Sequence, residues 1–222
     1  MDQLQSFLLV APVLLFSLVA HEYAHGYAAF RQGDMTAYQL GQLTWNPRPY
    51  IDPVGTIIVP IITYLSGFPF GWARSAPINS RNFRHFKRGD IIVSLAGVTA
   101  NFLVAIVAAL LVVVVGWMGR ALPQAAETLA YLQVMLRMGV LFNLILVSLN
   151  LVPIPPTDGS RVFRYLLPPK LAIKYARIGN VGFALVFLAI WFPPTARVIF
   201  APAMYANALL SRLFAPFVLP VS

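Results

Sequence analysis

The sequence predicts an all-α polytopic membrane protein with a small β element after its first helix. Hydrophobic residues make up 59% of the 222 residues and charged residues only 10%, and the mean hydropathy is +0.75. Several apolar runs reach the roughly 18 residues that a helix needs to cross a bilayer. This composition excludes a soluble globular fold. We expect one membrane domain over residues 1–222, with its core at about 4–165 and two C-terminal segments at 178–192 and 196–219.

Six apolar segments are expected to form helices, and they are Leu4–Phe30, Val54–Phe70, Ile91–Trp117, Leu132–Val152, Ile178–Phe192 and Ala196–Leu219. Pro60, Gly67 and Pro69 interrupt Val54–Phe70, so we expect this segment to be re-entrant or only partly inserted. The other five are expected to cross the membrane fully. The stretch Met35–Asp52 is rich in Thr, Tyr, Gln and Trp and is expected to form short strands or a hairpin, with an ordinary interfacial loop as the alternative.

Basic residues are concentrated in two loops, Arg74–Arg88 and the stretch from Asp158 to Arg177. Loops rich in Lys and Arg favour the cytoplasmic side. With the second segment only partly inserted, both clusters lie inside and Asp2 lies outside. The net charge of +9 therefore indicates membrane orientation and no nucleic-acid partner. His85, in the first of these loops, is interpreted as an interfacial residue near lipid headgroups.

The five residues from His21 to His25 read His-Glu-Tyr-Ala-His and lie inside the first apolar segment. Residues i and i+4 share one face of a helix, so both imidazoles can reach one metal ion. Glu22 projects about 100° away, close enough to touch a metal-bound water. Ionisable side chains are costly in hydrocarbon, and a trio inside a span indicates function. The chain has no cysteine, so nitrogen and oxygen atoms must hold the metal.

A second polar motif, Asn150 to Gly159, ends the fourth apolar segment. Its three prolines cannot continue a helix, so Asp158 emerges from a constrained turn at about the depth of His21 and His25. Two histidines and one aspartate with an open fourth position are typical of catalytic zinc. The alternative is that Asp158 is an exposed capping residue before the basic loop.

The two motifs together resemble those of the site-2 protease family of intramembrane zinc metalloproteases. In that family an HExxH helix is completed by the aspartate of an N-x-x-P-x-P-x-x-D-G motif. The residues that match the second motif here are Asn150, Pro153, Pro155, Asp158 and Gly159. The segments Ser94–Asn101, Gly41–Gly55 and Phe70–Ala73 are also similar to family segments, the last two to those of the small bacterial and archaeal branch without PDZ or CBS domains. The likeness covers about residues 15–165.

Two positions depart from the family pattern. Val98 replaces the usual proline, and Thr157 stands where leucine is common. Neither change removes a ligand or the base. The hydroxyl of Thr157 is close in sequence to Asp158, and a hydrogen bond to that carboxylate is an expectation.

The resemblance implies one Zn²⁺ held by His21, His25 and Asp158, and hydrolysis of peptide bonds in or near transmembrane helices. Zinc lowers the pKa of its bound water. Glu22 would take the proton of that water and deliver it to the leaving amine. Asn150 would orient the substrate or stabilise the developing oxyanion. The alternative for Asn150 is an interhelical hydrogen bond, which is also the favoured interpretation of Asn101, a second amide in the otherwise apolar spans.

The same resemblance implies transmembrane-helix substrates and a place in the cytoplasmic membrane of a prokaryotic cell, with the active site near the cytoplasmic face. Three other functions fit part of the pattern. Two histidines and a carboxylate also form the facial triad of non-haem iron oxygenases. A transporter would use an intramembrane ion site, but it predicts repeat symmetry that the sequence lacks. A relative without proteolytic activity would only bind membrane helices, and the intact Glu22 argues against it.

Overall fold

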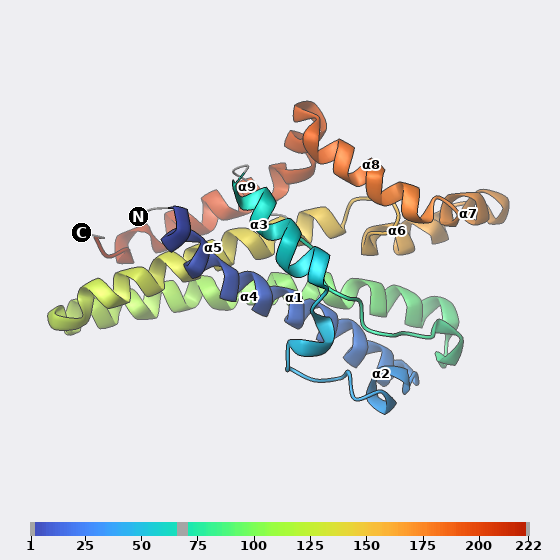
Figure 1. The fold of residues 1–222 in the computed structure, drawn as a ribbon, viewed down its shortest axis with the longest axis horizontal. Coiled ribbons are helices and arrows are strands. Elements are labelled where there is room, and N and C mark those ends of the chain that lie inside the picture. The colour runs from blue at the N-terminus through green and yellow to red at the C-terminus, as the bar shows by residue number, and fades with distance from the viewer. Residues whose placement is uncertain (1–2, 66–70, 221–222) are drawn as a thin grey trace. The chain divides into compact units, whose positions relative to one another are not determined.

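The computed structural model describes residues 3–65 and 71–220. Over these residues the chain is helical and contains no strand (Figure 1). The predicted β element is therefore wrong. The stretch Met35–Asp52 contains two single-turn helices, α2 (Thr36–Gln39) and η1 (Arg48–Tyr50). Side chains satisfy its backbone locally: the Asp34 carboxylate accepts from the Thr36 N–H, and the Asn46 side chain accepts from the Arg48 N–H. Backbone groups that are satisfied in this way need no neighbouring strand.

Four helical stretches among the described residues are long and apolar enough to cross a membrane, so the protein is a multi-pass membrane protein. They are Leu9–Gln32 in α1 (Gln3–Gln32), α4 (Phe86–Ala121), Pro123–Asn150 with η4 (Pro123–Ala125) and α5 (Ala126–Asn150), and Pro193–Phe217 with α9 (Pro193–Phe214) and η6 (Ala215–Phe217).

This count differs from the predicted five full crossings. A fifth exists only if α7 (Pro169–Ala176) and the following helix α8 (Gly179–Trp191), which meet at a bend of 78°, form one broken span. The 13 residues of α8 extend only about 20 Å at 1.5 Å per residue, which is shorter than the hydrocarbon core. The hydrophobicity of Ile178–Phe192 predicts an independent span, but it does not take the length of the helix into account.

The predicted partial segment begins with two short consecutive helices, η2 (Pro53–Ile58) and α3 (Val59–Leu65). Asp52 starts the first of them because its Oδ1 atom accepts from the N–H groups of Val54 and Gly55 at 3.1 and 2.7 Å. The end of the predicted segment, residues 66–70, lies outside the described residues, as does Asp2.

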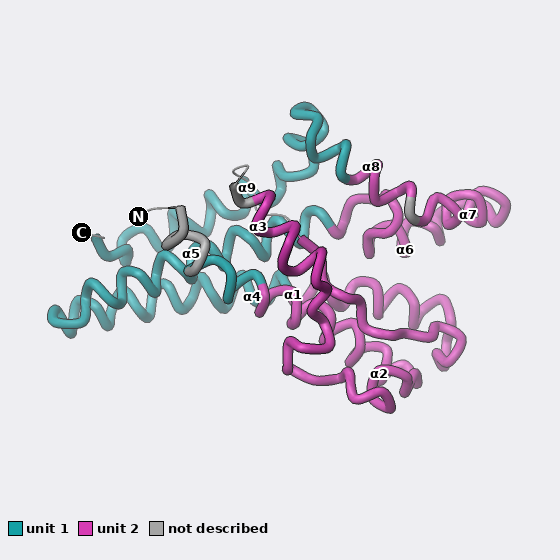
Figure 2. Tube along the Cα trace, in the orientation of Figure 1, with its two compact units in different colours: residues 1–14, 101–149, 187–222 teal, residues 15–100, 150–186 magenta. Residues whose placement is uncertain are grey.

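The chain divides into two compact units (Figure 2). Unit 1 comprises residues 1–14, 101–149 and 187–222, and unit 2 comprises residues 15–100 and 150–186. All five predicted site residues, which are His21, Glu22, His25, Asn150 and Asp158, belong to unit 2. The single-domain boundaries stay a prediction.

Two small apolar clusters hold the loop that precedes α4 against α1 in unit 2. One cluster joins Val19 of α1 to Tyr50 and Ala76. The other joins Ala29 of α1 to Phe83 and to Val93 of α4. Additional hydrogen bonds fix the same loop, among them Arg74 N–H to Tyr50 C=O and Arg84 N–H to Gln32 C=O. The loop is therefore placed along the helix that carries His21 and His25.

In unit 1, the side chain of Gln133 in α5 forms hydrogen bonds both to α4 and to the C-terminal residues. Its amide nitrogen donates to Val112 O at 2.7 Å and to Phe217 O at 3.0 Å, and its amide oxygen accepts from Leu219 N at 2.9 Å. The side chain is 1% exposed. Buried polar side chains of this kind are retained in membrane helices where they satisfy otherwise unpaired backbone groups.

Replacing Gln133 with alanine should lower the free energy of unfolding by about 2 kcal/mol, because three hydrogen bonds of a buried side chain disappear at roughly 0.6 kcal/mol or more each. Unfolding in a detergent titration would measure the change. Gln124→Ala is the matched control, since Gln124 is exposed. Equal free energies of unfolding for the two variants would show that the hydrogen bonds of Gln133 do not contribute to the stability of the fold.

Candidate metal centre

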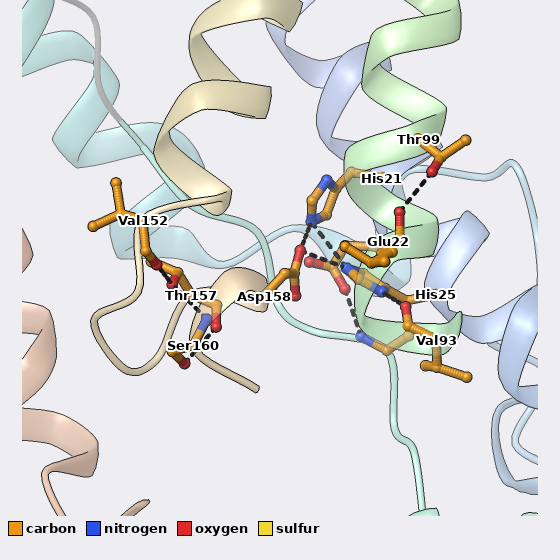
Figure 3. A network of polar contacts seen from close by, with 11 residues as sticks. His21, Glu22, His25, Val93, Thr99, Val152, Thr157, Asp158 and Ser160 are labelled. Carbon is orange, nitrogen blue, oxygen red and sulfur yellow. Dashed lines mark hydrogen bonds and ion pairs between the residues drawn. The ribbon is translucent and has the colours of Figure 1, made fainter. Parts of the chain in front are cut away.

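Three potential ligand atoms converge inside unit 2 (Figure 3). His25 Nε2 lies 3.0 Å from His21 Nε2 and 3.1 Å from Asp158 Oδ2, and His21 Nε2 lies 3.2 Å from Asp158 Oδ2. All three residues are buried. The structure thus brings together the two histidines of the first helix and the aspartate that lies 133 residues after the second of them.

The geometry of this triangle fits a zinc ion. Ligand atoms about 2.0–2.2 Å from a tetrahedral zinc lie roughly 3.3–3.6 Å from one another, slightly more than the observed 3.0–3.2 Å. Two imidazoles and one carboxylate also form a donor set that zinc accepts in catalytic sites, where a fourth position stays open. His21, His25 and Asp158 are therefore suited to hold the ion.

His25 is oriented by a backbone contact from α4. Its Nδ1 lies 2.7 Å from Val93 O, and because a carbonyl only accepts, Nδ1 must carry the proton. A neutral His25 then presents the lone pair of Nε2 to the other two ligand atoms. Such an outer contact fixes both the tautomer and the ring orientation of a metal-binding histidine. The Nδ1 atom of His21, by contrast, is buried and has no hydrogen-bond partner among the described residues.

Asp158 is the first residue of a short helix, α6 (Asp158–Phe163). Thr157 starts this helix: its Oγ1 atom accepts from Ser160 N and donates to the carbonyls of Val152 and Ile154. The expected bond from Thr157 to the Asp158 carboxylate is thus replaced by a helix cap.

Gly159 allows α6 to begin directly against the end of α5. A Cβ atom at this position would lie 2.5 Å from the carbonyl oxygen of Leu151 and 2.7 Å from its carbonyl carbon. Backbone cannot move aside as a flexible side chain would. Any larger residue would therefore push the neighbouring Asp158 away from the histidines.

Gly97 of α4 provides the space in which the two imidazoles meet. A Cβ atom on Gly97 would lie 2.4 Å from His25 Nε2, 2.6 Å from His21 Cε1 and 2.7 Å from His21 Nε2. These distances are well inside van der Waals contact. The absence of a side chain at position 97 is thus a requirement of the centre.

Gly97→Ala should weaken zinc binding by at least the 10–100-fold that loss of an outer-shell partner typically produces, because the methyl group would displace both ring nitrogens. A chelator competition assay on the purified protein would measure the dissociation constant. Gly139→Ala is a control in another helix, where the added Cβ would meet Val13 Cγ1 at the milder distance of 3.2 Å. Unchanged affinity in Gly97→Ala would contradict the described geometry.

Glu22 lies beside the three ligand atoms and is held by the loop before α4 (Figure 3). Its Oε2 atom accepts a hydrogen bond from the buried N–H of Ala76 at 2.9 Å. One carboxylate oxygen is thereby directed to the backbone, which limits the positions that the second oxygen can take. The contact therefore holds Glu22 beside the three convergent ligands without making it one of them.

Asp34 anchors the far end of this loop. Its carboxylate, 1% exposed, accepts from Asn79 N at 2.7 Å, from Asn82 Nδ2 at 2.8 Å and from the Thr36 hydroxyl at 2.5 Å. Burial alone would raise the pKa of Asp34, but these hydrogen bonds outweigh it and lower the pKa below its usual range. The loop from Ala76 to Asn82 is therefore fixed at both ends.

The remaining predicted residues lie as follows. Asn150 is the last residue of α5 and is half-buried. Asn101 is fully buried, and neither of its amide atoms has a hydrogen-bond partner in the described part of the chain, so the expected interhelical bond is not formed. The sequence alone does not indicate the roles of Val93, Ala76 and Asp34. Two of these act through the backbone, which no motif encodes, and only the scarcity of acidic residues singles out Asp34.

The chain is similar in sequence to several curated proteins that are named as zinc metalloproteases. The chain is 34% identical over 208 residues to the Bacillus subtilis protein named "Putative zinc metalloprotease YwhC", and the match covers 91% of each chain. It is 31% identical to "Putative zinc metalloprotease Rip2" of Mycolicibacterium smegmatis, over 87% of this chain and 71% of the relative. Rip2 of Mycobacterium tuberculosis strain H37Rv is 32% identical, over 90% of this chain and 72% of the relative. No family model and no solved structure matches the chain.

The similarity to YwhC extends over nearly the full length of both proteins. The relatives carry names of zinc metalloproteases, and the convergent His21, His25 and Asp158 can hold a metal ion. Zinc is therefore the cofactor that fits both findings. The chain belongs to the site-2 protease family of zinc metalloproteases.

Proposed function

We propose that the protein hydrolyses peptide bonds in or near transmembrane helices of other membrane proteins, with one zinc ion held by His21, His25 and Asp158. The observation that carries this proposal is the convergence of the three ligand atoms within 4.8 Å of one another. Two of them belong to α1, whose apolar stretch Leu9–Gln32 is long enough to cross a membrane.

The depth of the histidines supports cleavage within the membrane. From His21 to the end of α1 at Gln32 the helix rises by about 16 Å at 1.5 Å per residue. The basic stretch Arg74–Arg88 lies between α1 and α4 and includes the first residues of α4, and the basic stretch Asp158–Arg177 lies between α5 and α8. Basic loops favour the cytoplasmic side. The centre is then below the cytoplasmic surface of a prokaryotic cell membrane, and the scissile bond lies near that side.

The chemistry is divided between the ion and the protein. A zinc ion held by His21, His25 and Asp158 would supply polarisation of the scissile carbonyl and a lowered pKa of a bound water molecule. Glu22 accepts the proton of the attacking water and then donates it to the nitrogen of the leaving amine. The Ala76 N–H holds one oxygen of Glu22, so the other is available for this transfer. We assign to Asn150 the orientation of the substrate carbonyl or the stabilisation of its developing negative charge.

The substrate must open its own helix before it can react. Each peptide group inside a helix is hydrogen-bonded to the residue four positions away, which shields its carbonyl from attack. Substrates with helix-breaking residues near the scissile bond are therefore expected to be cleaved best, because fewer hydrogen bonds must be broken.

A panel of tagged single-span helices, reconstituted with the zinc-loaded protein in liposomes, tests the proposal. The products are mapped by mass spectrometry, with and without a chelator. We expect chelator-sensitive cuts within the apolar segment and close to one membrane face. Cuts confined to the water-exposed flanks, or no cuts in any helix of the panel, would contradict intramembrane hydrolysis.

A further inference from the structure

A polar cluster around the buried Asp90 links α4 to the segment that follows Asp158. Asp90, in the second turn of α4, is 6% exposed. Its Oδ2 atom accepts from Arg164 Nη2 at 2.9 Å and from the Tyr165 hydroxyl at 2.8 Å. Arg164 and Tyr165 open η5 (Arg164–Leu166), which directly continues α6. One carboxylate oxygen therefore holds the C-terminal end of the helix that Asp158 begins.

The same face of α4 contacts the histidine half of the centre. Asp90, Val93 and Gly97 are spaced i, i+3 and i+7, so they lie along one side of the helix. Val93 orients His25 through its carbonyl, and Gly97 leaves room for both imidazoles. Three consecutive turns of α4 thus touch the two parts of the chain that must converge on the metal.

The short helix α6 cannot fix its own orientation. It has six residues, and isolated helices of fewer than about 12–15 residues are marginal in water. Tertiary contacts at its ends must therefore decide where Asp158 points. Thr157 and Gly159 determine the N-terminal end, and the contacts of Asp90 determine the other.

We propose that Asp90 is a positioning residue that holds the Asp158 carboxylate in place for zinc through Arg164 and Tyr165. This inference depends on the proposed ligand set. A residue that positions a metal ligand changes metal affinity by more than it changes the stability of the metal-free fold. A residue that only joins α4 to η5 lowers the stability of the fold and leaves intrinsic zinc affinity unchanged.

Zinc dissociation constants of the full chain in detergent micelles, measured by chelator competition, test the proposal. Asp90→Asn should bind zinc 10–100-fold more weakly than the wild type, the usual effect of losing an outer-shell partner. Tyr165→Phe removes one of the two hydrogen bonds and should produce a smaller loss. Tyr165→Phe leaves the ion pair between Arg164 and Asp90 intact. It can therefore still decide the test if Asp90→Asn does not fold.

Asp34→Asn is the matched control, because it neutralises another buried carboxylate of unit 2 that does not contact Arg164, Tyr165 or a ligand. Unfolding of the metal-free proteins is measured in parallel, and the absorption spectrum of bound Co²⁺ reports the ligand geometry. We expect an altered spectrum and weaker binding in Asp90→Asn, a smaller change in Tyr165→Phe, and neither change in Asp34→Asn. Zinc affinity within twofold of wild type in Asp90→Asn and Tyr165→Phe, or an equal loss in Asp34→Asn, would overturn the proposal.

The variant His25→Ala distinguishes a failure of the Asp90 proposal from a failure of the proposed ligand set. If His25→Ala binds zinc as tightly as the wild type, then the ion is held elsewhere and the ligand assignment is wrong. If His25→Ala loses zinc while Asp90→Asn keeps full affinity, then the ligand set is right and the role of Asp90 is wrong.

Discussion

Replacing Glu22 with glutamine is expected to slow peptide hydrolysis by about 10²–10⁴-fold, the usual contribution of a general acid–base group, while zinc stays bound. Glutamine has nearly the size of glutamate, and its amide oxygen can still accept from the Ala76 N–H, which lies 2.9 Å from Glu22 Oε2. It cannot take a proton from water. The variant therefore removes the proton transfer and preserves the surrounding packing.

Rates of product formation and the zinc content of the same preparations check this expectation. Glu22→Asp is a useful companion, since it keeps a carboxylate but shortens the side chain and should lose part of the rate through misplacement. A Glu22→Gln protein that cleaves at the wild-type rate with zinc bound would refute the assignment of Glu22 as the base.

Removing any one of the three convergent ligands is expected to abolish stoichiometric zinc binding and, with it, hydrolysis. His21→Ala, His25→Ala and Asp158→Ala each leave two protein ligands, and a catalytic zinc site normally needs three. The loss should exceed the 10–100-fold change that follows from the loss of an outer-shell partner. Metal analysis after dialysis against a weak chelator would measure it.

His85→Ala is the matched control for these variants, because His85 is the third histidine of the chain and is exposed. It should retain one zinc per chain. Zinc should also raise the thermal unfolding temperature of the wild type, because a ligand that binds only the folded state stabilises it. Wild-type zinc content in His21→Ala, His25→Ala or Asp158→Ala would remove that residue from the ligand set.

The long helices were predictable because each depends on a local property of the chain. An apolar run of sufficient length favours a helix in a membrane wherever it occurs, since only a helix satisfies all its own backbone groups. The boundaries were less predictable. α4 begins at Phe86 and not at Ile91, because its first turn and a half is polar and is stabilised by contacts outside the helix, including those of Asp90.

The errors arose where composition was compatible with more than one local structure. Residues with strand propensity between Met35 and Asp52 form single turns of helix, because Asp34 and Asn46 bind backbone N–H groups nearby. The segment that forms α8 is apolar enough for a span but too short, and it joins α7 at a sharp bend. Neither outcome is visible in a hydropathy pattern.

The sequence by itself determined the class of membrane protein, the family and the candidate ligands, because these depend on composition, on i and i+4 spacing and on two motifs. Only the tertiary structure decided what surrounds the centre. Val93 O meets His25, Gly97 leaves space for the imidazoles, Ala76 N–H holds Glu22, and Asp90 holds the segment of Asp158. The physical reason is that these contacts use backbone atoms, an absent side chain or an ordinary ion pair. Such groups acquire a specific role only when packing brings distant segments of the chain together.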